Sequence, residues 1–182
     1  MHSILGISGS LRAGSLNTRL VHEAIRVYGP AQTKLADLRL PLYDGDAEDA
    51  QGIPENVTRL HAEIAAADAI ILSTPEYNKG PSGVLKNALD WVSRVKGPSP
   101  WRGKPLAIMS ATAGRAGGER AQSILRLFMV PFRPRILQGP EMLLAGAEKE
   151  FDAEGRLTSE VYSRTLAELM EALRAEVDRA RG

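Results

Sequence analysis

A glycine-rich segment near the N-terminus carries side chains that suit an anion. It follows the apolar run Ile4–Ile7 and contains Ser8-Gly9-Ser10-Leu11-Arg12-Ala13-Gly14-Ser15-Leu16-Asn17. Apolar residues recur at helical spacing beyond it, so the segment ends at a helix N-terminus, where free N–H groups and a partial positive charge attract anions. The candidate binding residues are Ser10, Arg12, Ser15, Leu16 and Asn17, and the arginine among them can bind phosphate in a bidentate manner. We expect this segment to bind a phosphate group.

The spacing of these residues indicates which class of phosphate-containing ligand the segment binds. No Gly-Lys-Ser/Thr sequence follows, which excludes the loop of nucleoside triphosphatases. Gly6, Gly9 and Gly14 do not match the Gly-x-Gly-x-x-Gly spacing of dinucleotide-binding folds. A terminal monophosphate therefore fits better than a pyrophosphate. The alternative is an ordinary turn of glycine and serine, in which Ser15 only caps the helix.

A second segment offers a surface for a flat ring. The apolar run Ala69–Leu72 is followed by Ser73-Thr74-Pro75-Glu76-Tyr77-Asn78, and a helical pattern begins shortly afterwards. A bound heteroaromatic ring needs hydrogen bonds at its edge and flat or apolar surface against its face. Backbone amides, the Asn78 amide and the Tyr77 ring can supply both. A phosphate loop and a ring loop, each between a strand and a helix, together indicate a bound mononucleotide.

These two segments, together with Gly83 and Leu85–Trp91, resemble the NADPH-dependent FMN reductase family, in particular its quinone and chromate reductase branch, over nearly the whole chain. The resemblance implies non-covalent FMN, with the isoalloxazine held largely through main-chain groups of Pro75, Glu76, Tyr77 and Asn78. For Glu76 we expect a structural or backbone-contacting role rather than that of a general acid, because hydride transfer to flavin N5 does not require a positioned protein acid. No residue is assigned as catalytic, because FMN carries the chemistry. NADPH or NADH would reduce the flavin and leave, and an electron acceptor would then take its place. Quinones, flavins, chromate, azo dyes and ferric chelates are the expected acceptors.

The resemblance also assigns a third loop, Ser110 to Gly118, which follows the strand pattern 106–109. Ser110, Thr112 and Gly114 match the family positions next to the pyrimidine end of the ring. Alternatively, the glycines of this loop reflect a mobile loop that caps the next helix. Arg115 has no role from the pattern alone, and our hypothesis is that it meets the 2′-phosphate of NADPH.

One position near the ring loop departs from the family pattern. The family pattern has a proline at the position that Ser82 occupies here, and in this chain the proline comes one residue earlier, at Pro81. Ser82 can cap a helix. The path of 79–81 is therefore open, as is the way in which Lys79 meets the second substrate.

The elements that would position these loops alternate along the chain. Strand patterns cover 4–7, 33–36, 69–72, 106–109 and 135–138, and helical stripes cover 16–28, 57–67, 84–92, 118–129 and 166–177. This alternation predicts an α/β fold with a doubly wound parallel sheet. The resemblance implies a flavodoxin-like, five-stranded sheet in the order 2-1-3-4-5 with helices on both faces. Its ligand would lie outside the carboxyl ends of strands 1 and 3.

The resemblance further implies an oligomer. The exposed flavin face would need a wall from a partner subunit, so we expect a homodimer or homotetramer. The long connection 38–54 is either a surface excursion or, by resemblance, a subunit contact near the partner's flavin site. Arg120 and Glu141 match family positions that pair between subunits. The alternative is that both are ordinary surface charges.

Composition excludes several other classes. The chain has 182 residues, a formal net charge of +1 and no cysteine. We expect one domain spanning 1–182, no drive toward nucleic acid or membranes, and neither a thiolate metal site nor a cysteine nucleophile. The three histidines are scattered, so no metal site is expected. No apolar run reaches the ~20 residues that span a bilayer, and Met1-His2-Ser3 leads directly into a strand, so we expect a cytoplasmic protein.

Three other functions are alternatives to the reductase. An FMN-binding electron carrier is disfavoured because such carriers are usually strongly acidic. A low-molecular-weight phosphatase would need a cysteine in its phosphate loop. A flavin sensor that binds FMN without turnover differs from the reductase only in its kinetics.

Overall fold

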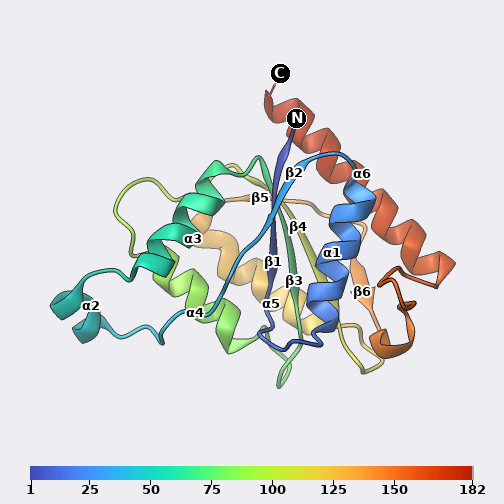
Figure 1. The fold of residues 1–182 in the computed structure, drawn as a ribbon, viewed down its shortest axis with the longest axis horizontal. Coiled ribbons are helices and arrows are strands. Elements are labelled where there is room, and N and C mark those ends of the chain that lie inside the picture. The colour runs from blue at the N-terminus through green and yellow to red at the C-terminus, as the bar shows by residue number, and fades with distance from the viewer. Residues whose placement is uncertain (182) are drawn as a thin grey trace.

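A parallel β-sheet forms the centre of the molecule (Figure 1). The computed structural model describes residues 1–181. The strands are β1 (Ser3–Ser8), β2 (Gln32–Leu35), β3 (Ala69–Thr74), β4 (Pro105–Ala111), β5 (Arg135–Ile136) and β6 (Met142–Leu144). They are ordered β2-β1-β3-β4-β5, with β6 also pairing with β4. The predicted flavodoxin-like order 2-1-3-4-5 is confirmed.

The outer edge of the sheet differs from the prediction. A single strand was expected over 135–138, but two short strands pair with successive parts of β4. Ile136 lies beside Leu106, and Met142 lies beside Met109. Pro140 lies between the two strands and has no N–H to donate to the ladder, which accounts for the interruption. The sheet therefore has six strands rather than five.

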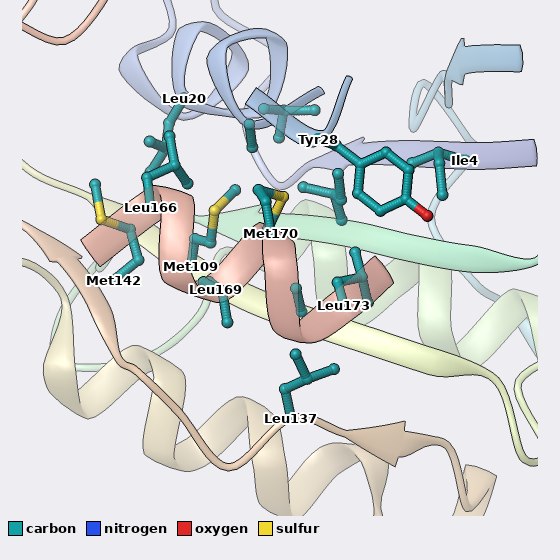
Figure 2. Packing of buried hydrophobic residues seen from close by; sticks show 14 of the residues in the cluster. Ile4, Leu20, Tyr28, Met109, Leu137, Met142, Leu166, Leu169, Met170 and Leu173 are labelled. Carbon is teal, nitrogen blue, oxygen red and sulfur yellow. The ribbon is translucent and has the colours of Figure 1, made fainter. Parts of the chain in front are cut away.

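Helices cover both faces of the sheet, as predicted. α1 (Leu16–Tyr28) and α6 (Glu160–Arg181) lie on one face, and α3 (Glu55–Ala66), α4 (Gly83–Val92) and α5 (Glu119–Met129) lie on the other (Figure 1). On the first face, Leu20 of α1 and Met170 of α6 pack around Met109 of β4 (Figure 2). Successive residues of β3 serve opposite faces: Ile71 belongs to the α1/α6 core and Leu72 to the other. Burial on both sides explains the continuous apolar runs.

The connection 38–54 starts in the core, where Leu38 is buried, and then forms an arm that lies apart from the sheet. It contains a short helix, α2 (Gly45–Gln51), which has no buried residue and lies at the far left of Figure 1. The base of the arm is fixed to α4: Trp91 Nε1 donates to the Pro41 carbonyl at 2.8 Å, and Tyr43 N–H donates to Asn87 Oδ1 at 2.8 Å. Trp91 is itself buried, so this contact joins the arm to the packed part of α4.

The three loops singled out in the sequence lie at one edge of the sheet, at the bottom of Figure 1. Strands β1, β3 and β4 are parallel neighbours, so their carboxyl ends meet there. Gly9 N–H donates to the Ser73 carbonyl at 2.8 Å, which joins the first two loops. No helix within the described residues is long and apolar enough to cross a membrane.

Candidate functional site

A cavity of about 640 Å³ opens between these three loops. Its volume lies in the range of roughly 300–1,000 Å³ that is usual for small-molecule and cofactor sites. Most of the predicted binding residues line it, namely Ser10, Arg12, Ser15, Leu16, Asn17, Pro75, Glu76, Tyr77, Thr112 and Gly114. Ser110 and Asn78 do not line the cavity. The fold thus gathers ten of the twelve residues at one site.

The end of the cavity at α1 is built for an anion. Ser15 caps the helix, because its Oγ accepts a hydrogen bond from Thr18 N–H at 3.1 Å. The N–H groups of Leu16 and Asn17, which lie before Thr18 in the first turn, have no acceptor within residues 1–181. This turn contains no acidic residue. Ser15 therefore caps the helix and lines the cavity as well, so the two interpretations of this serine are compatible.

Two arginines add positive charge at this end. Arg12 and Arg19 both line the cavity, and neither forms an ion pair with a carboxylate among the described residues. Arg19 was not predicted, although its place in the first turn of α1 was visible in the sequence. A cation there is unfavourable beside the positive end of the helix dipole unless an anion binds nearby. The arrangement fits a phosphate monoester.

The side chain of Asn17 is directed into the fold. Its Oδ1 accepts from Ser73 Oγ at 2.7 Å and from Ala111 N–H at 3.0 Å. Its Nδ2 donates to the Ala111 carbonyl at 2.9 Å. The sequence interpretation treated this amide as a phosphate donor, whereas most of its hydrogen-bonding capacity joins α1 to the ends of β3 and β4.

The phosphate loop and the ring loop are held in close contact. Ser82 Oγ donates to the Gly9 carbonyl at 2.5 Å and accepts from Leu85 N–H at 3.2 Å. The predicted role of Ser82 as the cap of α4 is confirmed. A Cβ on Gly9 would lie 3.1 Å from Ser82 Oγ and 3.2 Å from Pro75 Cδ. Glycine at this position permits the close approach of the two loops.

The ring loop ends in a tight hairpin turn. Tyr77 and Gly80 exchange two backbone hydrogen bonds, of 2.9 and 3.1 Å. Between them Asn78 and Lys79 have φ values of 50° and 68°, as in a type I′ turn. This turn answers the open question about 79–81 and places Asn78 and Lys79 at an exposed tip. The Tyr77 ring is half exposed at the cavity wall.

Glu76 contacts the backbone, in agreement with its interpretation from the sequence. Its Oε2 accepts a hydrogen bond from Ala121 N–H at 3.2 Å, at the start of α5. A carboxylate is favourable at this position because it satisfies a free N–H group and faces the positive end of the helix dipole. Glu76 thereby joins the ring loop to the helix that follows the third loop.

The third loop is held by Ser110, whose side chain is fully buried. Its Oγ donates to the Gly117 carbonyl at 2.5 Å and accepts from Gln122 Nε2 at 2.8 Å. Ser110 thus holds the loop in place without lining the cavity, whereas the resemblance placed it next to the ring. Thr112 and Gly114 line the cavity, and the loop is bonded to the segment after β6 through Ala147 N–H and the Thr112 carbonyl at 3.0 Å.

Further lining residues were not among the predicted binding residues. Glu148 follows β6, and Ala116 and Gly118 lie at the end of the third loop. Arg115, for which the sequence left only a hypothesis, also lines the cavity. No sequence signal identified Glu148, because only the pairing of β6 with β4 brings it to the cavity. The described residues contain no group of three or more potential metal ligands.

The donor set fits FMN. The part of the cavity lined by α1 and the loop before it offers two free N–H groups and two arginines for a phosphate, and the ring loop and the third loop offer a proline, a tyrosine and small residues for a flat ring. A conjugated ring with a phosphate side chain needs this combination of charge at one end and flat apolar surface at the other.

Comparisons with known proteins agree with this geometry. Residues 2–149 match the profile of the family described as NADPH-dependent FMN reductase. An NAD(P)H-dependent FMN reductase of Pseudomonas aeruginosa is 44% identical over 98% of this chain and 97% of its own length. A 2-hydroxy-1,4-benzoquinone reductase of Burkholderia sp is 38% identical over 94% of this chain and 93% of its own. Among solved structures, the flavoenzyme FerB, an NAD(P)H:(acceptor) oxidoreductase of Paracoccus denitrificans, superposes with a TM-score of 0.88 at 29% identity and covers 98% of each chain.

Proposed function

The chain belongs to the NADPH-dependent FMN reductase family and is an FMN-dependent NAD(P)H oxidoreductase, and from this premise we propose that its electron acceptors are quinones and comparable small oxidants. The binding of FMN is supported most directly by the cavity, which combines a cationic helix N-terminus with walls from the ring loop and the third loop. The quinone-reducing relative favours quinones among the acceptors. Flavins, chromate, azo dyes and ferric chelates are further acceptors to be compared with them.

The chain's own residues would bind and orient FMN. We assign the phosphate to the N–H groups of Leu16 and Asn17 and to the side chains of Arg12 and Arg19. We assign the ring to the walls formed by 75–77 and 112–114. When bound there, FMN would supply the redox chemistry, which is hydride acceptance from NAD(P)H followed by electron transfer to the acceptor. The protein would contribute position and electrostatics, and we propose no side chain as a catalytic acid.

Absorbance spectroscopy tests this proposal. The purified protein is mixed with FMN, desalted, and then treated anaerobically with NADPH. We expect a retained flavin band that bleaches with NADPH and recovers when a benzoquinone is added, faster than with a ferric chelate. A retained band that does not bleach would instead indicate a carrier or sensor, the alternative functions. Absence of a retained flavin would contradict the assignment of the cavity.

We propose that Arg115 contributes to the choice of dinucleotide. Arg115 is exposed at the cavity and forms no ion pair within residues 1–181. A charge-assisted contact with the 2′-phosphate of NADPH would be worth roughly 1.5–3 kcal/mol. Arg115→Ala should therefore raise the KM for NADPH about tenfold or more and leave the KM for NADH unchanged. Steady-state kinetics with both dinucleotides measure this, with Lys96→Ala, a cation outside the cavity, as the control. Equal effects on both dinucleotides would remove the hypothesis.

We also propose a homo-oligomer in which Arg120 of one subunit pairs with Glu141 of another. Both side chains are exposed and lack an ion-pair partner among the described residues, and Leu42 on the arm 38–54 is 85% exposed. Sedimentation of Arg120→Glu or Glu141→Arg should show smaller species, and the double charge swap should restore the wild-type size. Single variants that stay tetrameric would count against the pair.

The location of the protein in the cell is also a proposal. We propose that the protein acts in the cytoplasm, where NAD(P)H is available to it. Fractionation of the host cell, with the protein detected by antibody, would test this.

A further inference from the structure

The side chain of Asn17 connects all three loops that form the cavity. We propose that Asn17 is a positioning residue, whose amide sets the spacing between the phosphate anchor and the two ring-binding loops rather than binding the phosphate. This inference rests on the proposed binding of FMN at the cavity. It concerns how the chain holds the flavin in place.

The burial and contacts of the side chain carry the argument. Asn17 is 4% exposed and lies between the ends of β3 and β4. Both lone pairs of its Oδ1 are used, by Ser73 Oγ at 2.7 Å and by Ala111 N–H at 3.0 Å. One Nδ2 hydrogen is used by the Ala111 carbonyl at 2.9 Å. Rotating this amide toward a phosphate would leave buried polar groups unpaired, which is costly.

The position of Asn17 in the chain explains why this contact matters for the flavin. Its backbone N–H lies in the first turn of α1 and has no acceptor among the described residues, so it belongs to the phosphate anchor. Its side chain bonds Ser73, two residues before Pro75, and Ala111, directly before Thr112. One residue therefore fixes the phosphate anchor relative to both ring loops.

Ser73 provides a way to test this without changing a cavity residue. Its side chain is fully buried and does not line the cavity. The hydroxyl of Ser73 donates to Asn17 Oδ1 and has no other partner among the described residues, so we expect the effect of Ser73→Ala on flavin binding to pass through Asn17. Asn17→Ala removes the whole set of contacts, and Arg12→Ala is the matched control for loss of a phosphate contact alone.

The experiment compares dissociation constants for FMN and for riboflavin, which has the same ring and no phosphate. Asn17→Ala should weaken both flavins by a similar factor of roughly 10–100, and Ser73→Ala should weaken both by roughly 3–10. The double variant should bind no worse than Asn17→Ala within about twofold, because Ser73 acts through Asn17. Arg12→Ala should weaken FMN and leave riboflavin unchanged.

The circular dichroism of the flavin band at saturating FMN separates positioning from general loss of stability. It should change in Asn17→Ala and Ser73→Ala and remain as in the wild type in Arg12→Ala, because only the first two displace the ring-binding loops. Thermal unfolding identifies any variant that does not fold. Should Asn17→Ala fail to fold, Ser73→Ala carries the test alone.

The opposite pattern would overturn the inference. Asn17→Ala would then weaken FMN but not riboflavin, Ser73→Ala would bind like the wild type, and Asn17 would be a phosphate ligand. Wild-type protein that binds neither flavin would instead contradict the proposed function, so the two failures are distinguishable.

Discussion

Replacing Gly117 by alanine should destabilise the fold by about 2–5 kcal/mol, from the strain of a left-handed residue and from overpacking. Gly117 has φ +61°, and an added Cβ would lie 2.6 Å from the carbonyl carbon and oxygen of Leu143. These are backbone atoms of β6, so they cannot move aside as a flexible side chain would. Urea unfolding of the flavin-free protein measures the loss.

The same substitution should weaken flavin binding, although Gly117 does not line the cavity. Its carbonyl is the acceptor for Ser110 Oγ, and its neighbours Ala116 and Gly118 are lining residues. The matched control is Gly83→Ala, at the first residue of α4, where an added Cβ has nothing within 4 Å. That control should be neutral or stabilising by about 0.4–1 kcal/mol. Equal stability of the two variants would contradict the tight packing of the third loop against β6.

Replacing Ser15 by aspartate should weaken FMN binding by about 100-fold or more while leaving the fold nearly as stable. Aspartate caps helices as well as serine does, so the free energy of unfolding without flavin should change by less than about 1 kcal/mol. The added carboxylate faces the cavity at the anion end and repels a phosphate by a few kcal/mol, at about 1.4 kcal/mol per tenfold in affinity. Fluorescence titration with FMN measures the change.

Two comparisons make the result with Ser15 specific. Riboflavin has no phosphate, so Ser15→Asp should alter its affinity less than about threefold. Ser15→Ala should instead affect stability more than flavin binding. The missing cap should lower the free energy of unfolding by roughly 0.5–2 kcal/mol, and the affinity for FMN should fall less than in Ser15→Asp. If Ser15→Asp weakens riboflavin as much as FMN, the phosphate does not bind at this helix N-terminus.

The substitutions of Gly117 and Ser15 test features that the sequence predicted only in part. The glycines of the third loop allowed the interpretation of a mobile loop that caps the next helix, but the contact of Gly117 with Leu143 depends on the pairing of β6 with β4. Ser15 was interpreted either as a cap or as a phosphate ligand. The structure shows that the cap leaves two N–H groups of the same turn without an acceptor within residues 1–181. The cap and the anion site are therefore parts of one arrangement.

Local sequence determined the alternation of strands and helices, and the resemblance implied the strand order and the family, both of which are confirmed. A buried parallel strand needs a continuous apolar run, and parallel neighbours must end at one edge, so loops after β1, β3 and β4 had to meet. Residue types in these loops also indicated the chemistry, since glycine, serine and arginine before a helix suit a phosphate.

Only the tertiary structure decided which way the polar side chains of these loops point. Asn17 and Ala111 are 94 residues apart in the chain, and Ser110 and Asn17 look equally suited to a ligand in the sequence. The hydrogen bonds of each depend on the neighbours that strand register supplies, so Ser110 holds its own loop and the Asn17 amide joins three loops. Glu148 reaches the cavity for the same reason, through the pairing of β6 with β4. A motif fixes the backbone path and the residue types over a few positions, whereas the partners of a side chain are fixed by segments far away in the chain.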